Sequence, residues 1–147
     1  VAGCATFQHP KRARAASSNE KIVVGVMGLG RGKGLIQSFA PSENCHIEYV
    51  CDVDSRRLAE GASLVTNLAG NNPQQVVDVR KILDDKKVDA LVIAAPDHWH
   101  APATIMACNA GKHVYCEKPT SHNPQEGEWM IEAARKHNRV VQIGTQR

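Results

Sequence analysis

Short, uninterrupted apolar runs alternate with segments of helical periodicity along most of the chain. The first run, residues 22–27, ends in glycines and is typical of a buried strand. The runs predict strands over residues 22–27, 46–51, 76–79, 90–95, 112–116 and 140–143. The periodic segments predict helices over residues 34–39, 55–68, 81–84, 101–109 and 124–137. Strands separated by helices in this way predict an α/β doubly wound parallel sheet over residues 21–147, preceded by a leader at residues 1–20.

Polar residues gather where the predicted strands end. A glycine-rich turn at residues 28–34 follows the first strand, and Asp52 follows the second. Residues 96–100 follow the fourth strand, and residues 117–119 follow the fifth. Ligands of doubly wound sheets bind beyond the carboxyl ends of the strands, where the strand order reverses. These segments are therefore expected to form one site.

The turn after the first strand approximates the dinucleotide-binding pattern G-x-G-x-x-G. Gly28 and Gly30 fit it, but the third glycine position holds Lys33, with Gly32 and Gly34 on either side. Such glycines let the backbone approach a pyrophosphate, whose charge then lies at a helix N-terminus. A plain glycine-rich turn is the alternative. The residues expected to contact a cofactor here are Gly28, Leu29, Gly30, Arg31 and Gly32.

Asp52 lies about 20 residues after the glycine turn, where dinucleotide-binding folds place an acidic residue. Its carboxylate can accept both hydroxyls of an adenosine ribose and repels a 2′-phosphate, which favours NAD over NADP. A helix-capping acid is the alternative, and Asp54 is better placed for that role. Arg56 and Arg57 follow, and either guanidinium could turn toward a 2′-phosphate.

Two histidines flank a tryptophan after the fourth strand. Ala95 and Pro96 are expected to border the cofactor, together with His100. We expect three residues to line the nicotinamide and substrate pocket, where a neutral imidazole can hydrogen-bond a sugar hydroxyl: His98, Trp99 and His100. Alternatively, the tryptophan packs and the histidines are solvated. No metal is expected, because a local H-x-H lacks the spacing of common zinc motifs.

Composition argues against several other classes of protein. The formal net charge of +3 matches three cations near the start of the chain, Lys11, Arg12 and Arg14, so no basic face indicates nucleic acid. The five cysteines are odd in number and form no C-x-x-C pair, so neither a disulfide framework nor a zinc knuckle is indicated. No run of about 20 apolar residues occurs, so we expect no membrane span.

The leader resembles the end of an export signal. Residues 1–7 fit the tail of a hydrophobic region, and Ala13-Arg14-Ala15 fits an A-x-A cleavage site. Basic residues precede that site, as in twin-arginine signals. We therefore expect a periplasmic or exported protein, with a cytoplasmic one as the alternative. A disordered polar leader explains the same residues, and residues 1–4 also fit a lipobox.

Three runs carry a resemblance to a known family. They read D-A-L-V-I-A-A-P-D-H-W-H-A-P at residues 89–102, A-G-K-H-V-Y-C-E-K-P at 110–119 and R-V-V-Q-I-G-T-Q-R at 139–147. The chain resembles the Gfo/Idh/MocA oxidoreductases over residues 21–147, and among them the exported dehydrogenases similar to glucose-fructose oxidoreductase. The resemblance implies a Rossmann domain that binds NAD. In the family, a second α/β domain follows, mediates homo-oligomers and supplies part of the substrate site; we expect this chain to be a fragment without it.

The resemblance also implies a chemistry, which is hydride transfer between nicotinamide and the hydroxyl-bearing carbon of a sugar, polyol or related molecule. Lys118 is expected to bind the nicotinamide ribose and the reacting oxygen, and Glu117 to orient the lysine or the strand end. Pro119 is expected to fix the turn, through a cis peptide as in relatives. The family's partner histidine, in a D-x-x-x-H segment, lies outside this chain, so the fragment alone should turn over little. A surface turn at 117–119 is the alternative from the residues alone.

Two other functions stay open at this point. One is an NAD-dependent glycosidase of the same superfamily, which oxidises its sugar only transiently. The other is a non-catalytic NAD-binding module.

Overall fold

The computed structural model describes residues 21–145. The leader at residues 1–20, with its predicted cleavage site and export signal, lies outside the described residues. Within the described part of the chain, no helix is both long enough and apolar enough to cross a membrane.

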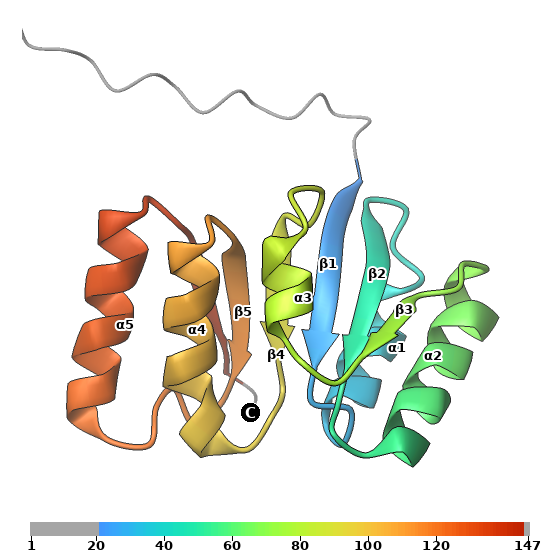
Figure 1. Cartoon of the computed structure of the whole chain (residues 1–147), viewed down its shortest axis with the longest axis horizontal. Coiled ribbons are helices and arrows are strands. Elements are labelled where there is room, and N and C mark those ends of the chain that lie inside the picture. Colours follow the sequence, from blue (N-terminus) through green and yellow to red (C-terminus); the bar gives the residue numbers. More distant parts are fainter. Residues whose placement is uncertain (1–20, 146–147) are drawn as a thin grey trace, which may run out of the picture.

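Six parallel strands form one sheet in the order β3-β2-β1-β4-β5-β6. The strands are β1 (Ile22–Met27), β2 (Cys45–Cys51), β3 (Gln74–Val76), β4 (Ala90–Ile93), β5 (His113–Glu117) and β6 (Val141–Gly144). The helices are α1 (Gly32–Phe39), α2 (Ser55–Ala69), α3 (Arg80–Asp84), α4 (His100–Asn109) and α5 (Pro124–Lys136), and a 3₁₀ turn η1 (Asp97–Trp99) leads into α4. The order reverses between β1 and β4, which confirms the doubly wound sheet. The strands' carboxyl ends share one edge, the lower edge in Figure 1.

Helices cover both faces of the sheet and bury an apolar layer on each. On one face α1 and α2 pack against the strands, with Val26 and Ile36 fully buried. On the other face α3, α4 and α5 do so, with Ile82 and Ile93 fully buried. Figure 1 shows α4 and α5 in front of the sheet and α1 behind it. Burial on both faces explains why the strands are continuous apolar runs.

Two predicted strands are wrong in their boundaries. β3 ends at Val76, where the prediction had it begin, because the Asp78 carboxylate accepts a hydrogen bond from the Arg80 amide (3.0 Å) and turns the chain into α3. β4 ends at Ile93, short of the predicted residue 95, and Pro96 beyond it has no N–H to extend a ladder.

Candidate active site

The loops after β1, β2, β3, β4 and β5 enclose two adjoining cavities at the carboxyl edge of the sheet. The larger has a volume of about 590 Å³ and is lined by the glycine turn and Asp52. The smaller has a volume of about 380 Å³ and is lined by His100 and Lys118. Three residues line both: Arg31, Ala94 and Ala95. The cavities are therefore contiguous across the point where the strand order reverses.

The glycine turn is built for close approach of the backbone. Gly28 has a positive φ of 87°, and a Cβ there would lie 2.4 Å from the amide nitrogen of Ala95. A Cβ on Gly32 would lie 3.1 Å from Val26, so Gly32 lets α1 pack on β1. Gly34 has only the Arg31 guanidinium nearby, at 3.4 Å. The third glycine of the motif is thus Gly32, which settles a register that the sequence left open.

Asp52 lines the larger cavity at the end of β2. Its carboxylate accepts hydrogen bonds from the amides of Leu29 (2.7 Å) and Asp54 (2.9 Å). Each carboxylate oxygen has a further lone pair, so two ribose hydroxyls can still be bound. Helix capping, the alternative role considered for Asp52, belongs to Asp54 as the sequence suggested. The Asp54 carboxylate caps α2 and accepts a hydrogen bond from the amide of Arg56 (2.9 Å). The Arg56 side chain beside it lowers the pKa of the Asp54 carboxyl.

The two arginines after Asp54 differ in where they lie. Arg56 forms an ion pair with Asp54 at 3.1 Å and lines neither cavity. Arg57 lines the larger cavity, and its guanidinium is the group nearest to Gly30. Arg57 is therefore the one of these two arginines that lines the larger cavity.

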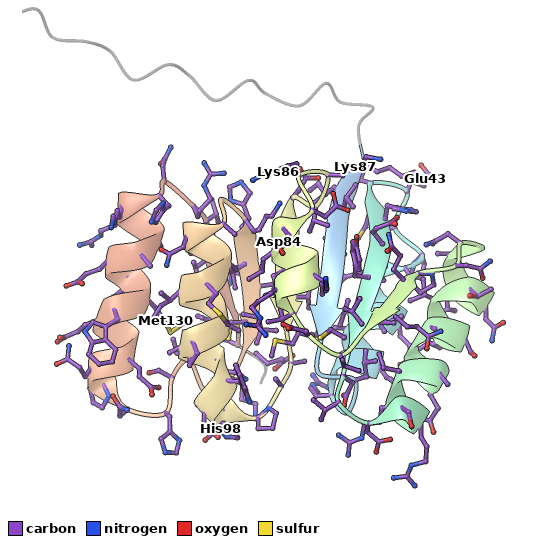
Figure 2. All side chains as sticks on the ribbon, viewed as in Figure 1. Glu43, Asp84, Lys86, Lys87, His98 and Met130 are labelled. Carbon is purple, nitrogen blue, oxygen red and sulfur yellow. The ribbon has the colours of Figure 1, made fainter. Side chains whose placement is uncertain are left out.

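The three residues after β4 that were predicted to line the pocket lie in different places. Trp99 lines the larger cavity and is 42% exposed. His98 lines neither cavity; its side chain is 62% exposed and lies at the carboxyl edge of the sheet (Figure 2). The charged residues Lys86 and Lys87 lie at the opposite edge, away from the site (Figure 2). His98 is therefore not a pocket residue in this structure.

His100 lines the smaller cavity but is buried, with 2% of its surface exposed. Its Nε2 lies 2.9 Å from the carbonyl oxygen of Ala95, and its Nδ1 lies within hydrogen-bond distance of the carbonyl oxygen of Pro119. Both ring nitrogens therefore already face backbone carbonyls, and the structure does not support the predicted hydrogen bond from His100 to a substrate hydroxyl. His100 instead joins the loop after β4 to the turn after β5.

Glu117, Lys118 and Pro119 end β5 as predicted. Lys118 is exposed and lines the smaller cavity, and its bond to Pro119 is cis, which confirms that prediction. Glu117 is buried, and its carboxylate pairs with the Arg31 Nε at 3.5 Å. The turn therefore presents its lysine to the cavity and directs its glutamate toward the glycine turn.

The sequence placed Asp97 in the segment expected at the site but assigned it no role; it lines the smaller cavity with Lys118. The Asp97 carboxylate accepts from the His98 amide (2.9 Å) and pairs with His122 at 3.4 Å. His122 lowers the pKa of the Asp97 carboxyl, so Asp97 stays ionised at neutral pH. Its place directly after Pro96 at a strand end was the available signal. Among residues 21–145, no cluster of three or more His, Cys, Asp or Glu side chains is arranged to hold a metal ion.

A family profile described as "Oxidoreductase family, NAD-binding Rossmann fold" (GFO_IDH_MocA) matches residues 22–145. The chain belongs to this family. Its Gfo/Idh/MocA fold and the glycine turn make residues 22–145 an NAD-binding Rossmann domain of an oxidoreductase, as the resemblance implied.

The Gfo/Idh/MocA relatives have several named activities. The uncharacterized oxidoreductase YrbE of Bacillus subtilis is 31% identical over 87% of this chain and 36% of its own length. A glycosyl hydrolase family 109 protein of Shewanella pealeana is 28% identical over 80% of this chain and 27% of its own length. The structure of scyllo-inositol dehydrogenase from Lactobacillus casei, with bound NAD(H) and scyllo-inositol, matches with a TM-score of 0.75 at 26% identity, covering 85% of this chain and 36% of that one. This chain thus spans about a third of the length of such relatives.

Proposed function

We propose that the chain is the cofactor domain of an NAD-dependent dehydrogenase that oxidises a hydroxyl group of a sugar, polyol or related molecule. The observation that carries the proposal is that two cavities adjoin and share three lining residues, one holding Asp52 and the glycine turn and the other holding Lys118. An extended dinucleotide has its two nucleoside ends in separate compartments joined by a diphosphate. The two cavities and their junction at Arg31 match that arrangement.

On the adenosine side, Asp52 discriminates between the two dinucleotides. Its carboxylate accepts the 2′- and 3′-hydroxyls of the ribose and repels a 2′-phosphate. Arg56, which could offset that repulsion, is paired with Asp54. Arg57, the one of the two arginines that lines the cavity, also lies near Asp54, with its Nε 4.0 Å from the carboxylate. We therefore infer a preference for NAD over NADP.

On the other side, Lys118 acts at the reacting oxygen. A bound nicotinamide would supply the acceptor for the hydride that leaves the carbinol carbon. The hydroxyl on that carbon loses its proton, and a carbonyl forms. The Lys118 ammonium donates to the oxygen and to the nicotinamide ribose, and so orients the hydroxyl. The proton passes to a base that the family supplies from outside this domain, a histidine.

The test is turnover by the full-length protein with NAD and a panel of inositols, monosaccharides and their glycosides. NADH formation with at least one free polyol or sugar supports the dehydrogenase. Failure of the whole panel to reduce NAD, in a protein that binds NAD, contradicts it.

An NAD-dependent glycosidase is the second candidate, favoured by the glycosyl hydrolase family 109 relative. It predicts release of free sugar from a glycoside without net NADH. The same panel decides between the two, because only a dehydrogenase accumulates NADH in proportion to product. NAD binding with neither NADH nor free sugar formed would support the third function, a non-catalytic NAD-binding module.

A further inference from the structure

Arg31 occupies the junction of the two cavities. Within residues 21–145, it is the one charged side chain that lines both. Arg31 is the N-cap residue directly before α1; its side chain makes no capping hydrogen bond, and the first turn of that helix holds no acidic residue. The positive end of the α1 dipole and the Arg31 guanidinium therefore lie near one another.

Glu117 holds this guanidinium from the opposite side of the junction. The carboxylate is 5% exposed and lies 3.5 Å from the Arg31 Nε, whereas the Arg31 side chain is 55% exposed. Little water screens a buried carboxylate from a nearby cation, so the contact favours the side-chain conformation of Arg31 that reaches β5. A guanidinium can bind one anion along its Nε edge and present its terminal nitrogens to another.

We propose that Arg31 is a diphosphate clamp and that Glu117 is the residue that positions it. This inference rests on the proposed function, because it assigns the junction between the cavities to the diphosphate of a dinucleotide. Arg31 binds the diphosphate through its terminal nitrogens. Glu117 holds the Arg31 side chain away from the adenosine ribose. Glu117 thereby acts on cofactor affinity through Arg31.

Lys33 provides a matched control. It lies in the same turn and carries the same charge, but it pairs with Glu60 on α2 at 2.6 Å and lines neither cavity. Long-range attraction of an anion predicts similar effects of removing either cation. A clamp predicts an effect of Arg31 alone.

The experiment is calorimetric titration of the 147-residue chain with NAD, ADP-ribose and adenosine. Arg31→Ala should weaken binding of NAD and ADP-ribose at least tenfold and leave adenosine unchanged, which also verifies that the adenosine side stays folded. Arg31→Lys should recover only part of the loss, because an ammonium cannot engage two anions along separate edges. Lys33→Ala should change none of the three affinities more than twofold.

Glu117→Gln tests the positioning role, since it keeps the shape and removes the charge. It should weaken NAD binding about threefold or more on its own, and less than twofold in the Arg31→Ala background, because coupled residues are not additive. Three results would each overturn the proposal. The first is an equal loss of NAD affinity from Glu117→Gln in both backgrounds, and the second is an Arg31→Ala variant that binds NAD normally. The third is a Lys33→Ala variant that loses as much NAD affinity as Arg31→Ala. An unmodified chain that binds no NAD would instead overturn the proposed function beneath it.

Discussion

The carboxylate of Asp52 accepts a hydrogen bond from the backbone amide of Leu29, at 2.7 Å. This contact joins the end of β2 to the glycine turn after β1, so the proposed ribose-binding residue is fixed to the loop that we propose approaches the diphosphate. The Asp54 amide donates to the other carboxylate oxygen at 2.9 Å. The side chain is thus held in place before any cofactor arrives, which lowers the entropic cost of binding.

Cofactor choice follows from this geometry. The chain should bind NAD at least tenfold more tightly than NADP, or about 1.4 kcal/mol, by calorimetry. Asp52→Ala should narrow that ratio, since it removes both the ribose acceptor and the repulsion of a 2′-phosphate. Asp54→Asn, which keeps a good helix cap but releases Arg56 from its ion pair, should narrow the ratio less than Asp52→Ala does. Equal affinities of the unmodified chain for NAD and NADP would contradict the role of Asp52.

Lys118 is predicted to serve the chemical step rather than cofactor binding. In the full-length enzyme, Lys118→Ala should lower kcat by about 10²-fold or more, the usual range for a positioned acid-base group. NAD affinity should fall much less, because Asp52 and the glycine turn hold the rest of the cofactor. Lys118→Arg should not restore the rate, since the bulkier, planar guanidinium cannot place a donor where the Lys118 ammonium lies. A near-normal kcat for the alanine variant would show that Lys118 is only a surface residue.

The positions of Asp52 and Lys118 could be predicted from sequence for a simple physical reason. Each directly follows or ends a strand, and a parallel sheet brings the carboxyl ends of its strands to one edge. Which side chains contact one another around the site depends on the conformations of side chains from segments far apart in the sequence, and hydrophobic periodicity does not encode these conformations. The Arg31–Glu117 and Asp97–His122 pairs are of that kind.

Local hydrogen bonds account for the other differences between sequence and structure. The polarity of His98 and His100 is similar, yet one is exposed and the other is buried between two backbone carbonyls. The end of β3 was likewise misplaced, because the apolar run continues past Val76 while the Asp78 carboxylate turns the chain.

Gly28 should tolerate no side chain. Gly28→Ala places a Cβ 2.4 Å from the Ala95 amide nitrogen on a backbone with positive φ, and should lower the free energy of unfolding by at least about 2 kcal/mol. Gly34→Ala is the matched control in the same turn: its Cβ meets only the flexible Arg31 guanidinium, and the variant should be unchanged or up to about 1 kcal/mol more stable. Urea denaturation measures both. Equal losses in the two variants would contradict the packing described for Gly28.

The thiols near the site should be chemically quiet. Burial raises the pKa of Cys51 to about 12 and that of Cys116 to about 11. A pKa of about 11 leaves roughly one thiolate in a thousand at pH 8, and only the thiolate reacts. In the native chain iodoacetamide should therefore modify the half-buried Cys45 before either of them, as read by peptide mass spectrometry, whereas urea should equalise the rates. Rapid native modification of Cys116 would mean that the end of β5 is open to solvent.

The most direct test of the account is a titration of the isotope-labelled 147-residue chain with NAD, followed by backbone amide NMR shifts. One site across both cavities predicts that the amides of Gly28, Gly30, Asp52, Ala95 and Lys118 shift together with a single dissociation constant. Amides on α5, outside both cavities, should stay in place. Shifts confined to α5 and β6, or none at millimolar NAD, would contradict an NAD site at the carboxyl edge of this sheet.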